Sequence, residues 1–339
     1  MNKLRFALFG TGFWARFQLH GWLETGGVEC VAVYNRTRSK AEAFAREFNI
    51  PAIYDDAETL LKHETLDFVD ICTNVETHAP LTTLAIAYKL PVVCQKPLGT
   101  TLAEATDMVT NCREQGVPLF VNENWRWQYP IRQFKHMLDT GRIGKPFRAR
   151  IDMISGFPVF KNQPFLADLE QFILTDLGSH TLDTARCFFG EANTLYCQTQ
   201  RVHPNIKGED VATIMMNMGD DVTVLVEMAY AENYLEREIF PQTLIFVEGS
   251  KGSLELASDF WIRETTADGT LARRYPPPRY PWADPAYDVV HSSIVACQAN
   301  ILEGLRGGAA ETTGEDNLKT VQLVFASYDS AAARQAILF

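Results

Sequence analysis

Short runs of β-branched and aromatic residues alternate with amphipathic helical segments over the first 122 residues. The apolar runs, each the length of one strand, are 4–9, 28–34, 68–72, 92–95 and 118–121. The segments between them include SKAEAFAREF, THAPLTTLAIAYK and TLAEATDMVTNCREQG, which have helical spacing and good helix formers. Parallel strands need long crossover connections, which helices supply. The alternation therefore predicts an α/β fold with a doubly wound parallel sheet.

The pattern changes at about residue 146, where strand-like segments follow one another with only turns between most of them. These segments are FRARIDMIS, TLYCQTQRVH, VATIMMNMG, VTVLVEMAYAE, QTLIFVEGS, GSLELA and FWIRETT. Successive strands without helices indicate a large, mostly antiparallel, open sheet. Two long helical stretches, 286–305 and 315–337, close the sequence, and the proline-rich YPPPRYPW indicates a surface loop. We expect two domains, 1–122 and 123–339.

Composition excludes several classes of protein. A hydrophobic fraction of 46% with 22% charged residues is typical of a globular protein. The net charge of −11 repels a phosphate backbone, so nucleic acid is not an expected partner. The seven cysteines show no CxxC spacing, which indicates reduced thiols and a cytoplasmic protein. The apolar run near residue 1 is too short for a signal peptide, and we expect no membrane span.

A glycine turn, GTGFWA at 10–15, separates the first apolar run from the first helical segment. Gly10 permits a tight turn, Gly12 lets a pyrophosphate approach the backbone, and Ala15 permits close helix packing. The helix N-terminus, with Phe13 and Trp14, offers free N–H groups to an anion. An ordinary strand-to-helix turn is the alternative, but the position of this motif favours a dinucleotide site.

The second apolar run ends in VAVYNRTRSK. An acidic residue normally stands here and binds the ribose hydroxyl of NAD. Asn35 takes its place, and Arg36 and Arg38 follow. A neutral amide does not repel a 2′-phosphate and arginine binds one, so we expect NADP to be favoured over NAD. Alternatively, these arginines are solvated charges at the start of a helix.

A lysine stands at the end of the fourth apolar run, in VVCQKPLGT. Pro97 lacks the N–H that a central strand needs, so the strand must end near Gln95 and Lys96. The carboxyl ends of parallel strands form the edge where doubly wound sheets bind ligands. Burial there is expected to lower the pKa of Lys96.

Five motifs resemble, in order and spacing, those of the Gfo/Idh/MocA oxidoreductases, and the resemblance covers nearly the whole chain. The motifs are GTGFWA, THAPL (77–81), QKP (95–97), DLGSH (176–180) and GEDNLKTVQLVFASYDS. The resemblance implies a Rossmann domain, a C-terminal substrate and oligomerisation domain, and oxidation or reduction of sugar or cyclitol hydroxyls. It places Lys96 beside the nicotinamide and substrate, and Thr73, Asn74 and His78 near the nicotinamide. His78 could equally cap or pack the helix that follows.

The sequence departs from this family at Gln95, where the family has a glutamate associated with the nicotinamide ribose. Gln95 can still accept a hydrogen bond there, and it can also donate one. Loss of the carboxylate would make Lys96 easier to deprotonate. Alternatively, the substitution marks a protein that has kept the fold and lost the chemistry.

An acid–histidine stripe lies in FILTDLGSHTLDTARCFFG. Asp176, His180 and Asp183 have the spacing i, i+4 and i+7, which places them on one face of an α-helix. The alternatives are a metal site, for which no second cluster is visible, and a structural ion pair. The resemblance implies that Asp176 and His180 face the substrate and that Asp183 supports them.

Polar and aromatic residues alternate in VNENWRWQYP at 121–130. Glu123, Asn124 and Arg126 lie among two tryptophans, a pattern that suits a sugar or nicotinamide site. We expect Asn124 and Arg126 to contact the cofactor. Plain packing of the tryptophans at a domain junction is the alternative.

Together these patterns predict an NAD(P)-dependent oxidoreductase acting on a secondary alcohol or ketone of a sugar, sugar derivative or cyclitol. His180 is the expected acid/base, with Lys96 polarising the oxygen and Asp176 orienting the histidine, although the roles of His180 and Lys96 could be exchanged. The alternatives are a cofactor-retaining glycosidase and a silent nicotinamide-binding regulator. Apolar strands such as VATIMMNM predict a homodimer or homotetramer formed through the C-terminal sheet. The identity of the substrate is left open.

Overall fold

The computed structural model describes residues 2–231 and 238–339, which divide into two compact units. The first unit holds the chain up to Asn124 together with Tyr280–Asp284 and His291–Val321. The other described residues form the second unit. We expected a single division after residue 122. The structure also divides the C-terminal part of the chain, because α9 (Asp288–Leu305) and α10 (Gly314–Ala333) contribute residues to both units.

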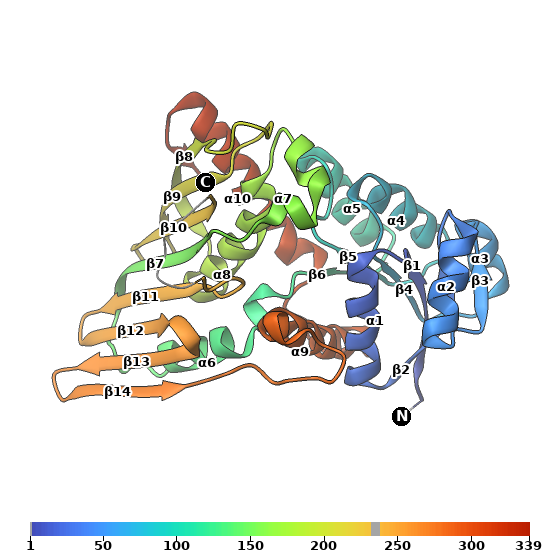
Figure 1. The fold of residues 1–339 in the computed structure, drawn as a ribbon, viewed down its shortest axis with the longest axis horizontal. Helices are drawn as coiled ribbons and strands as arrows, with labels where there is room; N and C mark the ends of the chain where they lie inside the picture. Colours follow the sequence, from blue (N-terminus) through green and yellow to red (C-terminus); the bar gives the residue numbers. More distant parts are fainter. Residues whose placement is uncertain (1, 232–237) are drawn as a thin grey trace. The chain divides into compact units, whose positions relative to one another are not determined.

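The first unit is built on a six-stranded parallel sheet with the order β3-β2-β1-β4-β5-β6 (Figure 1). Its strands are β1 Leu4–Phe9, β2 Val28–Tyr34, β3 Ala52–Tyr54, β4 Phe68–Ile71, β5 Val92–Gln95 and β6 Leu119–Asn122. The main helices between them are α1 Phe13–Thr25, α2 Arg38–Phe48, α3 Ala57–His63, α4 His78–Ala87 and α5 Leu102–Glu114. The predicted doubly wound sheet is confirmed. The three-residue β3 was not predicted, because so short a strand shows no periodicity.

The strand order reverses at the middle of this sheet, between β1 and β4. Sheets of this kind bind their ligands beyond the carboxyl ends of the strands at such a switch point. The glycine turn follows β1, and Lys96 follows β5, so both predicted features lie at this carboxyl edge.

The core of the first unit holds α1 against the centre of the sheet. Phe6 and Phe68, on neighbouring strands, stack with ring centroids 4.9 Å apart, and Trp22 of α1 packs against both rings. The Trp22 indole N–H donates a 2.7 Å hydrogen bond to Asp70 on β4, which is fully buried. Helix α1 starts immediately after the glycine turn, so this packing also fixes the turn.

Side-chain caps define where two of the helices begin. The Asp56 carboxylate accepts a 2.7 Å hydrogen bond from the Thr59 N–H at the start of α3. At the start of α5 the Glu104 N–H donates to the Thr101 hydroxyl, and the Glu104 carboxylate accepts from the Thr100 N–H. Such caps satisfy backbone N–H groups that have no partner inside the helix.

The described residues of the second unit form a nine-stranded sheet in the order β14-β13-β12-β11-β7-β10-β9-β8-β15. The strands are β7 Pro146–Ser155, β8 Ala192–Gln200, β9 Val211–Met218, β10 Val222–Tyr230, β11 Leu244–Gly249, β12 Gly252–Ala257, β13 Trp261–Thr266, β14 Gly269–Arg274 and β15 Ile337–Leu338. All pairs are antiparallel except β7 with β10. The mostly antiparallel sheet is thus confirmed. Strand β14 was not predicted, because all its residues are exposed and lack an apolar face.

One face of this sheet is covered by helices of the same unit. Helix α6 (Tyr129–Asp139) lies against β12, and α8 (Ser179–Phe189) lies against β7 and β10. A short helix, α7 (Val159–Asn162), follows β7. Burial alternates along β7, where Ala149, Ile151 and Met153 are buried while Arg148 and Arg150 are exposed. The sheet therefore has an apolar face under the helices and a mixed outer face.

All seven cysteines are free thiols. Across 2–231 and 238–339, no helix has the length and apolar character needed to cross a membrane.

Candidate active site

The glycine turn leaves open space at the N-terminus of α1. Gly10 has a φ of +105°, and a Cβ there would lie 2.4 Å from the carbonyl oxygen of Cys72, so only glycine fits. A Cβ on Gly12 would meet no atom within 4 Å, so packing of the protein does not require this glycine. The first turn of α1 has no acidic residue. This combination fits the pyrophosphate of a dinucleotide, which needs close backbone approach and free N–H groups.

An aromatic group begins α1. Phe13 is 67% exposed, and its ring makes edge contacts with Trp14 and Phe17, with ring centroids 5.3 and 5.0 Å apart. A large apolar ring left this exposed beside open backbone is available to a ligand.

Asn35, which follows β2, ties the end of that strand to the glycine turn. Its side-chain Nδ2 donates a 2.6 Å hydrogen bond to the Thr11 hydroxyl, and its Oδ1 accepts from the Thr37 N–H at 2.9 Å. The carboxamide is therefore engaged within the protein. A ligand reaching this corner would meet an amide already held in place.

The two arginines after Asn35 differ in their surroundings. Arg38 pairs with Glu42 at 3.2 Å and lies 3.8 Å from Asp55. Arg36 is exposed and has no ion-pair partner in the described part of the chain. Of the two guanidinium groups, that of Arg36 is the more available to an anion.

His78 connects two loops at the carboxyl edge. Its Nδ1 lies 3.0 Å from the carbonyl oxygen of Pro97, and its Nε2 lies 3.2 Å from that of Thr73. The residue is 1% exposed, and burial lowers the pKa of its imidazole, which favours the neutral ring. The ring thus fixes Thr73 relative to the segment after Lys96. Asn74, also predicted near the nicotinamide, is exposed at the same edge.

Gln95 ends β5 and is 9% exposed. Its side-chain Oε1 accepts a 2.9 Å hydrogen bond from the backbone N–H of Lys96. This bond uses one of the two lone pairs of the oxygen, so the carboxamide can offer a ligand its Nε2 donor and the second lone pair of Oε1. The peptide bond between Lys96 and Pro97 is cis, and the Lys96 side chain is half-buried at the strand end.

Asn124 is buried at the end of the first unit, and its Nδ2 donates a 2.6 Å hydrogen bond to the Ser293 hydroxyl. This contact joins the segment after β6 to α9. The amide that was predicted to touch the cofactor is therefore at least in part a structural link.

The acid–histidine stripe of the second unit is not one continuous α-helix. Asp176 lies in a π-helical turn, η4 (Leu174–Gly178), and α8 begins only at Ser179. The expectation of a regular α-helical face therefore holds for His180 and Asp183 but not for Asp176. π turns are rare and frequent at functional sites. The spacing of residues in the sequence does not reveal a π turn, because its one additional residue can be of any type.

Arg126 and Asp183 form a buried ion pair. The guanidinium Nε and Nη2 donate to the two carboxylate oxygens at 2.6 and 2.5 Å, and the side chains are 6% and 0% exposed. Arg126, predicted to bind the cofactor, thus holds α8 through the η2 turn (Trp125–Trp127). No cluster of three His, Cys, Asp or Glu residues that could hold a metal occurs in the chain as described.

Two aromatic residues beside this stripe were missed in the sequence. Trp125 of η2 stacks on His180 with ring centroids 4.4 Å apart. Burial raises the pKa of the Tyr230 phenol, and the nearby Asp176 carboxylate raises it further, so Tyr230 stays protonated beside that acid. The tryptophan was visible in VNENWRWQYP, but its contact with a residue 55 positions away was not.

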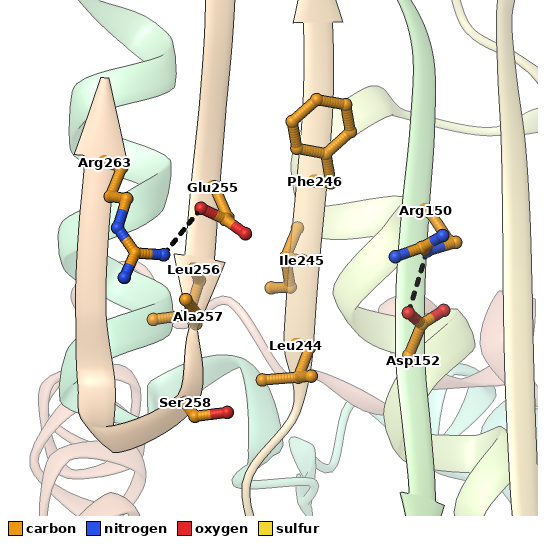
Figure 2. A pocket seen from close by; sticks show the side chains of 10 residues that line it. All are labelled: Arg150, Asp152, Leu244, Ile245, Phe246, Glu255, Leu256, Ala257, Ser258 and Arg263. Atoms are coloured by element: carbon orange, nitrogen blue, oxygen red, sulfur yellow. Dashed lines mark hydrogen bonds and ion pairs between the residues drawn. The ribbon is translucent and has the colours of Figure 1, made fainter. Parts of the chain in front are cut away.

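A pocket of about 320 Å³ lies on the second unit's sheet, across β7, β11, β12 and β13 (Figure 2). It contains the ion pairs Arg150–Asp152 and Arg263–Glu255, at 2.8 and 2.9 Å, with the Phe246 ring beside them. None of the predicted catalytic or cofactor residues lines it. We therefore do not identify it as the active site.

Family models match both units. Residues 4–123 match the oxidoreductase family with an NAD-binding Rossmann fold, and residues 131–255 match the GFO/IDH/MocA C-terminal domain. The predicted family, Rossmann sheet and oxidoreductase activity are thereby confirmed.

Similarity to individual proteins extends over the whole chain. A D-apiose dehydrogenase of Rhizobium rhizogenes is 41% identical, covering 98% of this chain and 96% of the relative. One of Paraburkholderia graminis is 42% identical, covering 98% and 88%. A crystal structure of an oxidoreductase from Agrobacterium radiobacter, in complex with NAD+, L-tartaric acid and magnesium, superposes with a TM-score of 0.96 at 40% identity, covering 99% and 98% of the two chains. The chain is an oxidoreductase that belongs to the Gfo/Idh/MocA family.

Proposed function

We propose that this protein is a nicotinamide-dependent sugar dehydrogenase whose substrate is D-apiose or a sugar that closely resembles it. The observation that carries the proposal is the 41–42% identity to two D-apiose dehydrogenases over nearly the full length of this chain. The open glycine turn and the lysine at the carboxyl edge of the sheet supply the parts that such a reaction needs.

In this proposal the cofactor occupies the carboxyl edge of the first unit. The backbone at Gly10 and Gly12 receives the pyrophosphate, with Phe13 and Trp14 at its side. Thr73, Asn74 and Gln95 surround the nicotinamide end. When bound, the nicotinamide accepts or returns the hydride equivalent of the substrate's C–H bond.

We further propose that NADP(H) binds more tightly than NAD(H). Arg36 supports this, because it is exposed and has no acidic partner among the described residues. Asn35 brings no negative charge to oppose a 2′-phosphate. The Agrobacterium relative was crystallised with NAD+, so paired titrations of both cofactors are the direct test. Tighter binding of NAD+ would contradict this part of the proposal.

The proton of the substrate hydroxyl goes to His180 in this scheme. Oxidation of a carbinol breaks a C–H and an O–H bond, and a base near the oxygen must take the proton. Lys96 donates a hydrogen bond to the same oxygen and stabilises its developing negative charge. Asp176 orients the imidazole or holds a neighbouring hydroxyl, beside the protonated Tyr230.

The experiment is a panel of D-apiose, other sugars, inositols and their keto forms, assayed at 340 nm with both cofactors. Lys96→Met and His180→Ala are each expected to lower kcat by about 10² or more while nicotinamide still binds. The matched controls are Lys62→Met on α3 and His136→Ala on α6, both exposed in the structure.

The panel also separates the alternatives. Hydrolysis of a glycoside without net change at 340 nm would identify the cofactor-retaining glycosidase. Cofactor binding without turnover of any panel member would identify the silent regulator. Normal turnover by both Lys96→Met and His180→Ala would refute the catalytic assignment.

We also propose that the protein forms a homodimer or homotetramer through the outer face of the second unit's sheet. Met215 on β9 is 51% exposed there. Phe246 and Leu244 line the pocket on β11, which is separated from β9 by β10 and β7. Asp152 on this face is 14% exposed, and burial raises the pKa of its carboxyl to about 6. An isolated sheet face with apolar residues and a half-buried acid is suited to a second copy.

Sedimentation of the wild type and Phe246→Arg tests the association. We expect the wild type to be an oligomer at micromolar concentration and Phe246→Arg to be a monomer. Arg263→Gln, a smaller change on the same face, is the control. A wild type that sediments only as a monomer would defeat this proposal.

A further inference from the structure

We propose that Trp125 is a positioning residue that holds the imidazole of His180 in its working orientation. The inference rests on the proposed function, in which His180 takes the hydroxyl proton. A proton acceptor must stay within hydrogen-bond reach of its donor, and a displacement of about 1 Å can cost about 10²-fold in rate. The His180 ring therefore needs a partner that fixes its plane.

The indole of Trp125 lies nearly flat on this imidazole. The ring centroids are 4.4 Å apart and the planes differ by 19°. Trp125 is 4% exposed and His180 is 6% exposed, so little water reaches the stack. A flat stack covers one face of the imidazole and restricts its rotation. The contact thus limits the orientation of the ring.

The indole is itself fixed in its own plane. Its Nε1–H donates a 2.8 Å hydrogen bond to the hydroxyl of Thr243, which is 1% exposed and precedes β11. A buried tryptophan N–H needs such a partner, and the bond prevents the indole from sliding along the imidazole.

The same turn holds α8 at a second point. Arg126, the next residue of η2, forms the bidentate pair with Asp183, which is three residues after His180 along α8. Residues three apart on a helix lie on the same side, so η2 fixes the helix one turn beyond the ring that Trp125 covers. A turn that merely filled space would not need both the hydrogen bond of Trp125 and the ion pair of Arg126.

The test is a double-mutant cycle between Trp125 and His180. Trp125→Leu removes the stack and is expected to lower kcat about 10-fold or more, with the KM for the nicotinamide cofactor unchanged within about 2-fold. Trp125→Phe keeps a ring over the imidazole and should restore most of the rate. The control is Trp127→Leu, in the same turn, whose ring lies 4.4 Å from the guanidinium carbon of Arg132.

The decisive comparison is made in the His180→Ala background. If Trp125 acts through His180, then Trp125→Leu causes no further loss there, because the ring it positions is gone. If the two losses multiply, Trp125 is a packing residue and the positioning proposal is wrong, while the role of His180 stands. If His180→Ala alone keeps normal turnover, the assignment of His180 fails first and the positioning proposal fails with it.

A second variant covers the case in which Trp125→Leu does not fold. Thr243→Val removes only the acceptor of the indole N–H and keeps the volume. It should lower kcat by a smaller factor than Trp125→Leu, and this loss should also vanish in the His180→Ala background. A loss that persists there would count against the proposal.

Discussion

Asp70 is expected to make the first unit less stable as the pH rises from 4 to 7. It is fully buried on β4, and its partners are the neutral groups of Trp22, Asn122 and Cys72, at 2.7, 3.1 and 3.5 Å. Burial raises the pKa of its carboxyl to about 6, although these hydrogen bonds partly offset the effect. An unfolded aspartate has a pKa of about 3.9. The folded protein therefore binds the proton more tightly, so the favourable contribution is complete below about pH 4 and is lost as the pH rises through 6.

The size of the effect follows from these two pKa values. A difference of about 2 units corresponds to a loss of about 3 kcal/mol in the free energy of unfolding once both states are ionised. About 1 kcal/mol of this is already lost at pH 4.5, so the change between pH 4.5 and 7.5 is about 2 kcal/mol.

Asp70→Asn removes the titration with little change in shape. The new amide can accept from Trp22 and donate to the Oδ1 of Asn122, which has no partner in the described chain, after rotation of the Asn122 amide. The wild type should lose about 2 kcal/mol of unfolding free energy between pH 4.5 and 7.5 through Asp70, and the variant should not. Relative to the wild type, the variant therefore gains about 2 kcal/mol over this range. Urea unfolding measures it, with hydrogen exchange of the β4 amides reporting on the first unit alone.

The matched control is Asp107→Asn, an exposed acid on α5. Its difference from wild type should be the same at both pH values. If Asp70→Asn behaved like this control, the raised pKa of Asp70 and the reasoning from its burial would be refuted.

Three further substitutions test other contacts. Asn35→Asp should shift preference from NADP toward NAD, because a carboxylate repels a 2′-phosphate, and unchanged relative Kd values in paired titrations would count against the role of Asn35. Arg126→Met should destabilise the second unit by about 3–5 kcal/mol in chemical denaturation, because it removes the guanidinium that pairs with the buried Asp183 carboxylate. The double variant Arg126→Met/Asp183→Asn should regain stability, and a double variant as unstable as Arg126→Met would contradict this reasoning. Gly10→Ala should abolish nicotinamide binding in calorimetry, because its Cβ would overlap a carbonyl oxygen of the neighbouring strand, and retained affinity would contradict the turn geometry.

The first unit could be read from the sequence because its signals are local. Strands β1, β2 and β5 begin and end where the apolar runs do, since a buried parallel strand is apolar throughout and is flanked by turn residues. The glycine turn was recognisable for the same reason, because Gly10 must adopt a conformation that other residues avoid.

The arrangement around His180 could not be read in this way. Its stack with Trp125 joins residues 55 positions apart, and the partner of Arg126 is 57 positions away. Such pairings depend on tertiary packing rather than on periodicity. The succession of strands likewise predicted the antiparallel sheet but did not predict that β7 and β10 pair in parallel. That pairing depends on how strands far apart in the sequence come together.

The π turn at Leu174–Gly178 has a consequence for how this enzyme can change. Such a turn contains one residue more than an α turn, so a single-residue deletion could convert it to regular helix. Each residue of an α-helix advances the chain by about 100° around its axis, at 3.6 residues per turn. The deletion would therefore swing Asp176 around the axis relative to His180 while the sheet beneath stayed intact. If Asp176 faces the substrate as we propose, a one-codon change in length would present a different polar group there, without exchange of any loop.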